Sequence, residues 1–218
     1  MGCRRCAQVL AEQVPDVEPL AQHARVREQA AEALVDTRPI PLPIAQHEIC
    51  HLVAAHVVGY PGAFLECIAR PTSGSTWFES PFEGSDDGLR DRVLRAITYT
   101  LAGRVADDRN GMERWPFSSR TDLLLVDRWL AQIGHAGGHS DAIAPLRFLA
   151  AEICRDAWKP LIVPLAVVLR DQRRLAGPGV TAFLEKSPEA QELRWFYRRA
   201  FASPTSKEQP VDVPGATV

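Results

Sequence analysis

The chain lacks a surplus of either charge. Its 25 Lys and Arg residues nearly balance its 27 Asp and Glu residues, so the formal net charge is -2. Non-specific binding to nucleic acid depends on a basic surface that neutralises phosphates. The balance therefore argues against a general nucleic-acid-binding protein, and we expect no nucleic-acid partner.

Long apolar runs are also missing. The longest, Leu161–Leu169, has nine residues and contains Pro164, whereas a transmembrane helix needs about 20. The N-terminal segment carries charges but no long apolar stretch of the kind found in a secretory signal. Five cysteines at uneven spacing make no disulfide framework. We therefore expect no membrane span and a cytoplasmic location.

What the sequence does contain is the composition of one globular domain. Hydrophobic residues make up 46% of the 218 residues and charged residues 24%, close to globular averages. Apolar residues at three- and four-residue steps predict helices at 17–35, 43–58, 87–108, 120–134, 140–157, 160–175 and 188–201, with a short turn near 179–185. Two runs of strand-forming residues, 63–69 and 75–80, predict a β-hairpin.

Composition divides the chain into three parts. Residues 1–39 predict an N-terminal helical extension that ends in a proline-rich connector. Residues 40–202 predict a mainly α domain with one small β-hairpin next to a helix. Residues 203–218 are poor in apolar side chains and predict a disordered tail. Cys3 and Cys6 have C-x-x-C spacing without a second pair, which argues against a structural zinc site there.

The clearest chemical pattern is the H-E-x-x-H motif formed by His47, Glu48 and His51 on the predicted helix 43–58. Residues four apart lie on one helix face, so both imidazoles can bind one ion. Glu48 projects beside that ion, where its carboxylate can accept a proton from an attacking water. The neighbouring residues are apolar, and a buried His-Glu-His group without a ligand would be costly. The pattern predicts a Zn2+ site with Glu48 as the general base.

The residues after the motif exclude two classes of zinc protease. The long metzincin motif needs Gly at position 54 and His at position 57, where this chain has Ala54 and Val57. A thermolysin-like enzyme takes a glutamate from a downstream helix, but Glu66 and Glu79 fall in the predicted hairpin. A third ligand must therefore come from farther along the chain.

The order of motifs resembles that in the peptidase domain of the FtsH family. The members of this family are AAA+ zinc proteases. The zinc helix is followed by a hairpin, by the stretch Leu101–Asp108 and by the segment Ser118–Leu123, which opens a helix. The family has H-E-A-G-H, G-G-R-A-A-E-E and S-N-D-L at the corresponding places. The resemblance covers about residues 40–186 and implies that Asp122 is the third zinc ligand. It also implies a zinc metalloendopeptidase that acts on unfolded or partner proteins.

The chain also departs from that family. Ile49 and Cys50 replace the Ala-Gly inside the zinc motif, and Asp107 and Asp108 replace the paired glutamates. The sequence has no Walker A motif, so the resemblance implies a peptidase without its own ATPase. We expect the strand at 75–80 to be a sheet edge that aligns an extended peptide by main-chain pairing.

Some site residues have a second interpretation. From spacing alone, Ser119 and Asp122 fit a capping box, in which Asp122 only closes a helix N-terminus. Asp107 or Asp108 would orient a zinc histidine, but a solvated acid at a helix end is the commoner case. Cys50 lies off the ligand positions, and we expect it to pack rather than to bind metal.

Alternatives remain for the rest of the chain and for its function. We expect His56, His135 and His139 to be ordinary core, surface or loop histidines. The segment Arg194–Arg199 predicts either a half-buried terminal helix or a partner-binding face. The alternative function is a non-catalytic zinc-stabilised protein-interaction module, and a third is a peptidase with a single partner protein as its target.

Overall fold

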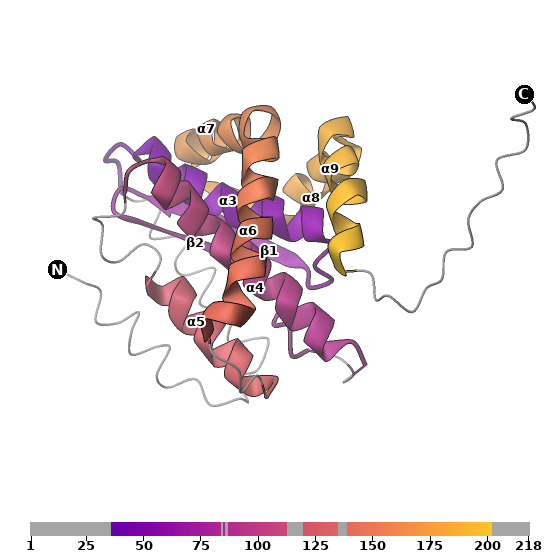
Figure 1. The fold of residues 1–218 in the computed structure, drawn as a ribbon. Coiled ribbons are helices and arrows are strands. Elements are labelled where there is room, and N and C mark those ends of the chain that lie inside the picture. Colours follow the sequence, from indigo (N-terminus) through magenta and orange to yellow (C-terminus); the bar gives the residue numbers. More distant parts are fainter. Residues whose placement is uncertain (1–35, 84, 86, 113–119, 135–138, 202–218) are drawn as a thin grey trace, which may run out of the picture.

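A computed structural model describes residues 36–83, 85, 87–112, 120–134 and 139–201. Over these residues the protein is mainly helical, with one small three-stranded antiparallel sheet beside a central helix (Figure 1). The predicted fold class, mainly α with a small β-hairpin, is confirmed. The predicted helix 17–35 and the tail 203–218 lie outside the described residues.

Helices make up most of the described chain. They are α3 (Leu42–Val58), α4 (Leu89–Arg109), α5 (Arg120–Gln132), α6 (His139–Ala157), a π-helical turn (Trp158–Ile162), α7 (Val163–Gln172), α8 (Gly177–Lys186), α9 (Pro188–Arg198) and a short 3-10 turn (Arg199–Phe201). The break expected near residue 158 is instead the π-helical turn. Pro160 lies in this turn and lacks the N–H that a regular helix needs. None of the described helices combines the length and the apolar character that crossing a membrane requires.

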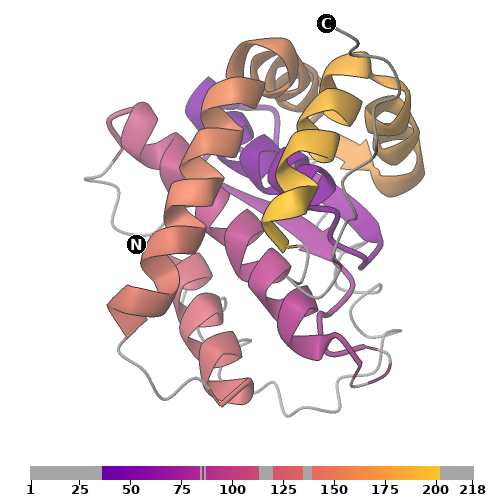
Figure 2. The same cartoon turned by 45° about the vertical axis from the view of Figure 1, so that its right-hand side comes forward.

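Helix α3 lies at the centre of the fold and carries the H-E-x-x-H motif. It begins after the extended Pro41 and ends at Gly59, whose φ of 66° lies in the left-handed region that favours glycine. From Ile44 to Val58 every residue except His56 is buried. The burial arises because α4, α6, α7, α9 and the sheet all pack against α3 (Figure 2).

The predicted hairpin is present next to α3. Strands β1 (Phe64–Arg70) and β2 (Ser73–Phe78) are antiparallel, and Arg70 pairs with Ser73 across the turn. The turn is tighter than predicted, so Gly74 lies inside β2. In the sheet order β2-β1-β3, β2 has a neighbour on one side only. No strand among the described residues pairs with its other edge.

The third strand, β3 (Arg174–Ala176), corrects the prediction of a helix through residue 175. Helix α7 ends at Gln172, and Arg173 takes a left-handed conformation with φ of 65°. The chain then turns so that Leu175 pairs with Cys67 of β1. The predicted short turn near 179–185 is a full helix, α8.

Candidate metal centre

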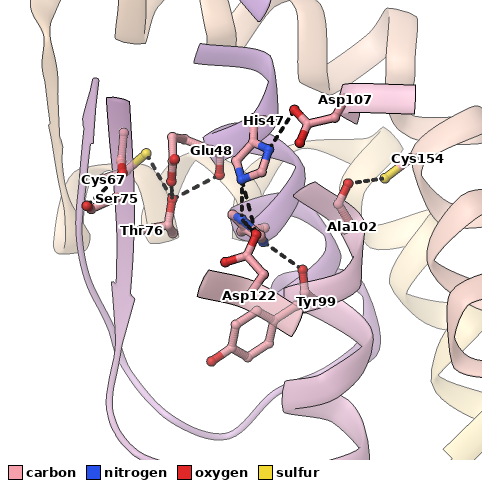
Figure 3. A network of polar contacts seen from close by, with 12 residues as sticks. His47, Glu48, Cys67, Ser75, Thr76, Tyr99, Ala102, Asp107, Asp122 and Cys154 are labelled. Atoms are coloured by element: carbon pink, nitrogen blue, oxygen red, sulfur yellow. Dashed lines mark hydrogen bonds and ion pairs between the residues drawn. The ribbon is translucent and has the colours of Figure 1, made fainter. Parts of the chain in front are cut away.

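Two histidines of α3 and one aspartate of α5 meet at a single point. His47 and His51 are one helical turn apart, and their Nε2 atoms lie 3.0 Å from each other. Oδ2 of Asp122 lies 3.3 Å from Nε2 of His47 and 3.5 Å from Nε2 of His51 (Figure 3). Both histidines are buried. The three residues could hold a metal ion, because one ligand atom from each lies within 4.8 Å of the others.

The far nitrogen of each imidazole is tied to α4. Nδ1 of His51 lies 2.9 Å from the main-chain oxygen of Tyr99, and Nδ1 of His47 lies 2.9 Å from Oδ1 of Asp107. A carbonyl or carboxylate oxygen only accepts hydrogen bonds, so both Nδ1 atoms must carry the proton. In the neutral imidazoles, both Nε2 atoms then present a lone pair to the site. This is the tautomer that binds metal.

When both imidazoles are neutral, three lone-pair atoms therefore converge on one point. Within the described residues, Oδ2 of Asp122 is buried and has no hydrogen-bond partner. Acceptors this close repel one another unless a proton or a metal cation lies between them. Two imidazoles and one carboxylate are a common donor set for Zn2+ that leaves a fourth position open. The residues present thus fit the predicted metal.

The convergence also shifts the pKa values of the three side chains. Burial lowers the pKa of His47, but the hydrogen bond to Asp107 and the nearby charge of the Asp122 carboxylate outweigh it, and the pKa lies well above its ordinary value. For His51, burial acts in the same direction and the charge of Asp122 again outweighs it. Burial raises the pKa of Asp122, yet the two histidines hold it well below its usual range. Protons and a metal ion therefore compete for the same lone pairs.

The expectation that Asp107 is a solvated acid at a helix end is wrong. Its side chain is 1% exposed and faces His47, because the last turns of α4 pack against α3. Asp107 continues the buried stripe of α4 that includes Thr100 and Gly103, and this helical phase is the signal that could have identified it. Asp108, one residue on, points to the other side and forms ion pairs with two arginines.

Asp122 occupies the first turn of α5, which begins at Arg120. Its carboxylate faces the two histidines of α3 rather than solvent. A carboxylate in a first turn also interacts favourably with the helix dipole. The capping-box alternative requires Ser119, which lies outside the described residues.

Glu48 is buried on the side of α3 that faces β2. Thr76 donates a hydrogen bond from Oγ1 to Oε2 of Glu48 over 2.7 Å (Figure 3). Burial raises the pKa of Glu48, and His47, His51 and Thr76 oppose the rise without cancelling it. A carboxyl with a raised pKa is suited to take up and release a proton near neutral pH. Sequence reasoning missed Thr76, although strand alternation places it on the same face of β2 as Gly74.

The remaining candidates do not join the site. Cys50 is fully buried, and burial raises the pKa of its thiol well above the ordinary value, so it packs as a neutral side chain. Helix α9 buries Ala190 and Tyr197 and leaves Trp195 and Phe196 exposed. The other candidates lie outside the described residues: Cys3, Cys6, His135 and the side chain of His139.

Comparison of the chain with models of known protein families and with curated proteins finds no match.

Proposed function

We propose that the protein is a zinc-dependent metallopeptidase that hydrolyses peptide bonds without an ATPase of its own. The observation that carries the proposal is a centre of three converging acceptors with a buried carboxylate, Glu48, on the same helix. His47, His51 and Asp122 hold the zinc. When bound, the ion supplies a Lewis acid that polarises the scissile carbonyl and lowers the pKa of water.

The chain's own residues perform the proton transfers. Glu48 takes a proton from water as the water oxygen attacks the carbonyl carbon. It returns that proton to the amide nitrogen as the C–N bond breaks, so the carboxylate is regenerated. The hydrogen bond from Thr76 holds the Glu48 carboxylate during this cycle. Asp107 and the main chain of Tyr99 keep the imidazoles in the metal-binding tautomer.

The free edge of β2 is the proposed surface for the substrate. An extended peptide can add to an unpaired strand through main-chain hydrogen bonds. Because Thr76 of this strand contacts Glu48, a peptide on the edge lies near the general base. Unfolded segments are the substrate class, since folded proteins offer few extended and unpaired stretches.

The order of elements supports an FtsH-like peptidase domain. The helix with the H-E-x-x-H motif, a hairpin, the α4 stretch Leu101–Asp108 and a helix with an aspartate in its first turn follow one another. The approach of Asp122 to His47 and His51 supports the assignment of the third ligand. We propose this relationship for the peptidase domain alone.

A non-catalytic zinc-stabilised interaction module is the second candidate. The observation that favours it is burial, because His47 and His51 are only 5% and 6% exposed and structural zinc sites are closed. A structural site has no use for Glu48, whereas hydrolysis requires it.

Metal analysis and a cleavage assay test the proposal. We expect protein purified without added metal to contain one zinc ion per chain. We expect it to cleave an unfolded protein, and a chelator to abolish cleavage until zinc is restored. The absence of any transition metal would contradict both functions, whereas zinc without hydrolysis would favour the interaction module.

A further inference from the structure

Two glycines border the site where other residues would carry a side chain. We propose that Gly103 and Gly74 are positioning residues. Because it has no side chain, Gly103 leaves the space that the two zinc-binding imidazoles occupy, and Gly74 leaves the space that the Glu48 carboxylate occupies. The inference deepens the proposed function and rests on it for the roles of the seated side chains.

Gly103 lies in α4 directly against both imidazoles. A Cβ atom at this position would lie 2.4 Å from Cε1 and Nε2 of His51 and 2.7 Å from Cε1 of His47. Real Cβ contacts are essentially never shorter than 3.0 Å, so the rings would have to move. Their Nδ1 atoms are held by α4. Movement would therefore break those hydrogen bonds or separate the Nε2 atoms from Asp122.

Gly74 lies against Glu48, the proposed general base, as closely as Gly103 lies against the histidines. A Cβ atom here would lie 2.4 Å from Cγ, 2.5 Å from Oε1 and 2.7 Å from Cδ of Glu48. Thr76, on the same face of β2, donates to the other carboxylate oxygen. Strand β2 thus leaves room for the carboxylate and holds it. An added methyl group would displace Glu48 from Thr76 while the three metal ligands stay in place.

The backbone does not explain either glycine. The described glycines with positive φ are Gly59, Gly88, Gly111 and Gly134, so Gly74 and Gly103 adopt conformations open to any residue. In a helix interior or a strand, glycine is also less favourable than alanine. The lack of a side chain is therefore what these two positions require, and each serves a different half of the site.

Zinc content and kinetics separate the two halves. We expect Gly103→Ala to weaken zinc binding by about 10- to 100-fold, the loss typical when ligand orientation is disturbed. We expect Gly74→Ala to keep zinc and to lose about 100-fold in kcat with little change in KM, since a displacement of about 1 Å has this effect on rate. Gly179→Ala in α8, where an added Cβ meets nothing within 4 Å, is the matched control. Parent-like zinc binding by Gly103→Ala, or parent-like kcat in Gly74→Ala, would overturn the corresponding assignment.

A stability measurement in chelator tests the steric claim without zinc or hydrolysis. We expect Gly103→Ala to lower Tm in the parent. In a His51→Ala background the two closest atoms are absent and only Cε1 of His47, at 2.7 Å, remains in the way, so the same change should lower Tm by less than it does in the parent. Gly74→Ala should likewise lose its effect on Tm in a Glu48→Ala background. If a glycine substitution lowers Tm equally in both backgrounds, that glycine has an ordinary packing role and the inference is overturned.

The proposed function and the roles of the glycines are contradicted by different results. A parent protein without zinc or activity would contradict the proposed function, whereas only the glycine variants, compared in the two backgrounds, can contradict the roles of Gly103 and Gly74. If Gly103→Ala does not fold in the parent, the double variant with His51→Ala should fold, because the two closest contacts are gone. A double variant that remains unfolded would contradict the steric role of Gly103.

Discussion

Glu48 is the residue that separates an enzyme from a structural metal site. Glutamine keeps the shape of the side chain and can still accept the hydrogen bond of Thr76, but it cannot take a proton from water. We expect Glu48→Gln to keep its zinc and to lose about 1,000-fold in kcat, within the range for a general base. The measurement is the rate of peptide cleavage beside elemental analysis of the same sample. Cleavage at the parent rate would contradict the mechanism.

Asp122 is the ligand whose side chain has a competing structural role. Asparagine caps helices about as well as aspartate but is a poor zinc ligand. We expect both Asp122→Asn and Asp122→Ala to lose zinc affinity by orders of magnitude. In chelator, only Asp122→Ala also removes the side-chain oxygen that could close the helix start, so it should be the less stable of the two by about 1 kcal/mol. Zinc titration and urea unfolding of both variants provide the comparison, and full zinc retention in Asp122→Asn would exclude the ligand role.

At the scale of the element, the end of α3 depends on the left-handed conformation of Gly59. An added Cβ would lie 3.4 Å from Nη1 of Arg95, an ordinary contact, so the cost of a side chain there is one of backbone conformation. We expect Gly59→Ala to reduce the free energy of unfolding by about 1 kcal/mol, and Gly59→Asn by less. Zinc content should not change, because His51 lies two turns before the helix end. Urea unfolding measures the effect, provided that the denaturant dependence (m-value) of the variant equals that of the parent. An unchanged free energy of unfolding in Gly59→Ala would contradict the left-handed helix end.

Sequence patterns correctly predicted those helices and strands whose conformation is set by residues close to them in the chain. The four-residue spacing of His47 and His51 was sufficient to place both rings on one helix face. The strand β3 could not be predicted, because its three residues are extended only through pairing with β1, far away in the sequence. The inward direction of Asp107 depends on how α4 packs against α3. The local sequence shows that Asp107 shares a helix face with Thr100 and Gly103, but it does not show which face of α4 packs against α3, nor that residues 174–176 pair with β1.

At the scale of the whole molecule, His56 couples folding to pH. Burial and the charge of Arg194 lower its pKa from 6.5 to about 4, and its Nε2 has no hydrogen-bond partner among the described residues. The unfolded chain therefore takes up a proton at higher pH than the folded protein does. The contribution of His56 to stability is complete above pH 6.5 and is lost as the pH falls toward 4.

We therefore expect His56→Gln to lose less stability than the parent between pH 6.5 and 4. The measurement is the free energy of unfolding in urea at several pH values, in chelator. Titration of His47 and His51 is common to both proteins and cancels in the difference. Parallel pH profiles for the two proteins would contradict the lowered pKa.

The pairing of β3 with β1 has a consequence for synthesis on the ribosome. Helix α3 and the hairpin emerge early, but Glu66, which is buried in the complete fold, has its ion-pair partner, Arg174, in the late strand β3. A nascent chain that stops before residue 174 lacks both this partner and the strand that pairs with β1. The three-stranded sheet can therefore be completed, and the Glu66 carboxylate paired, only after translation has passed β3.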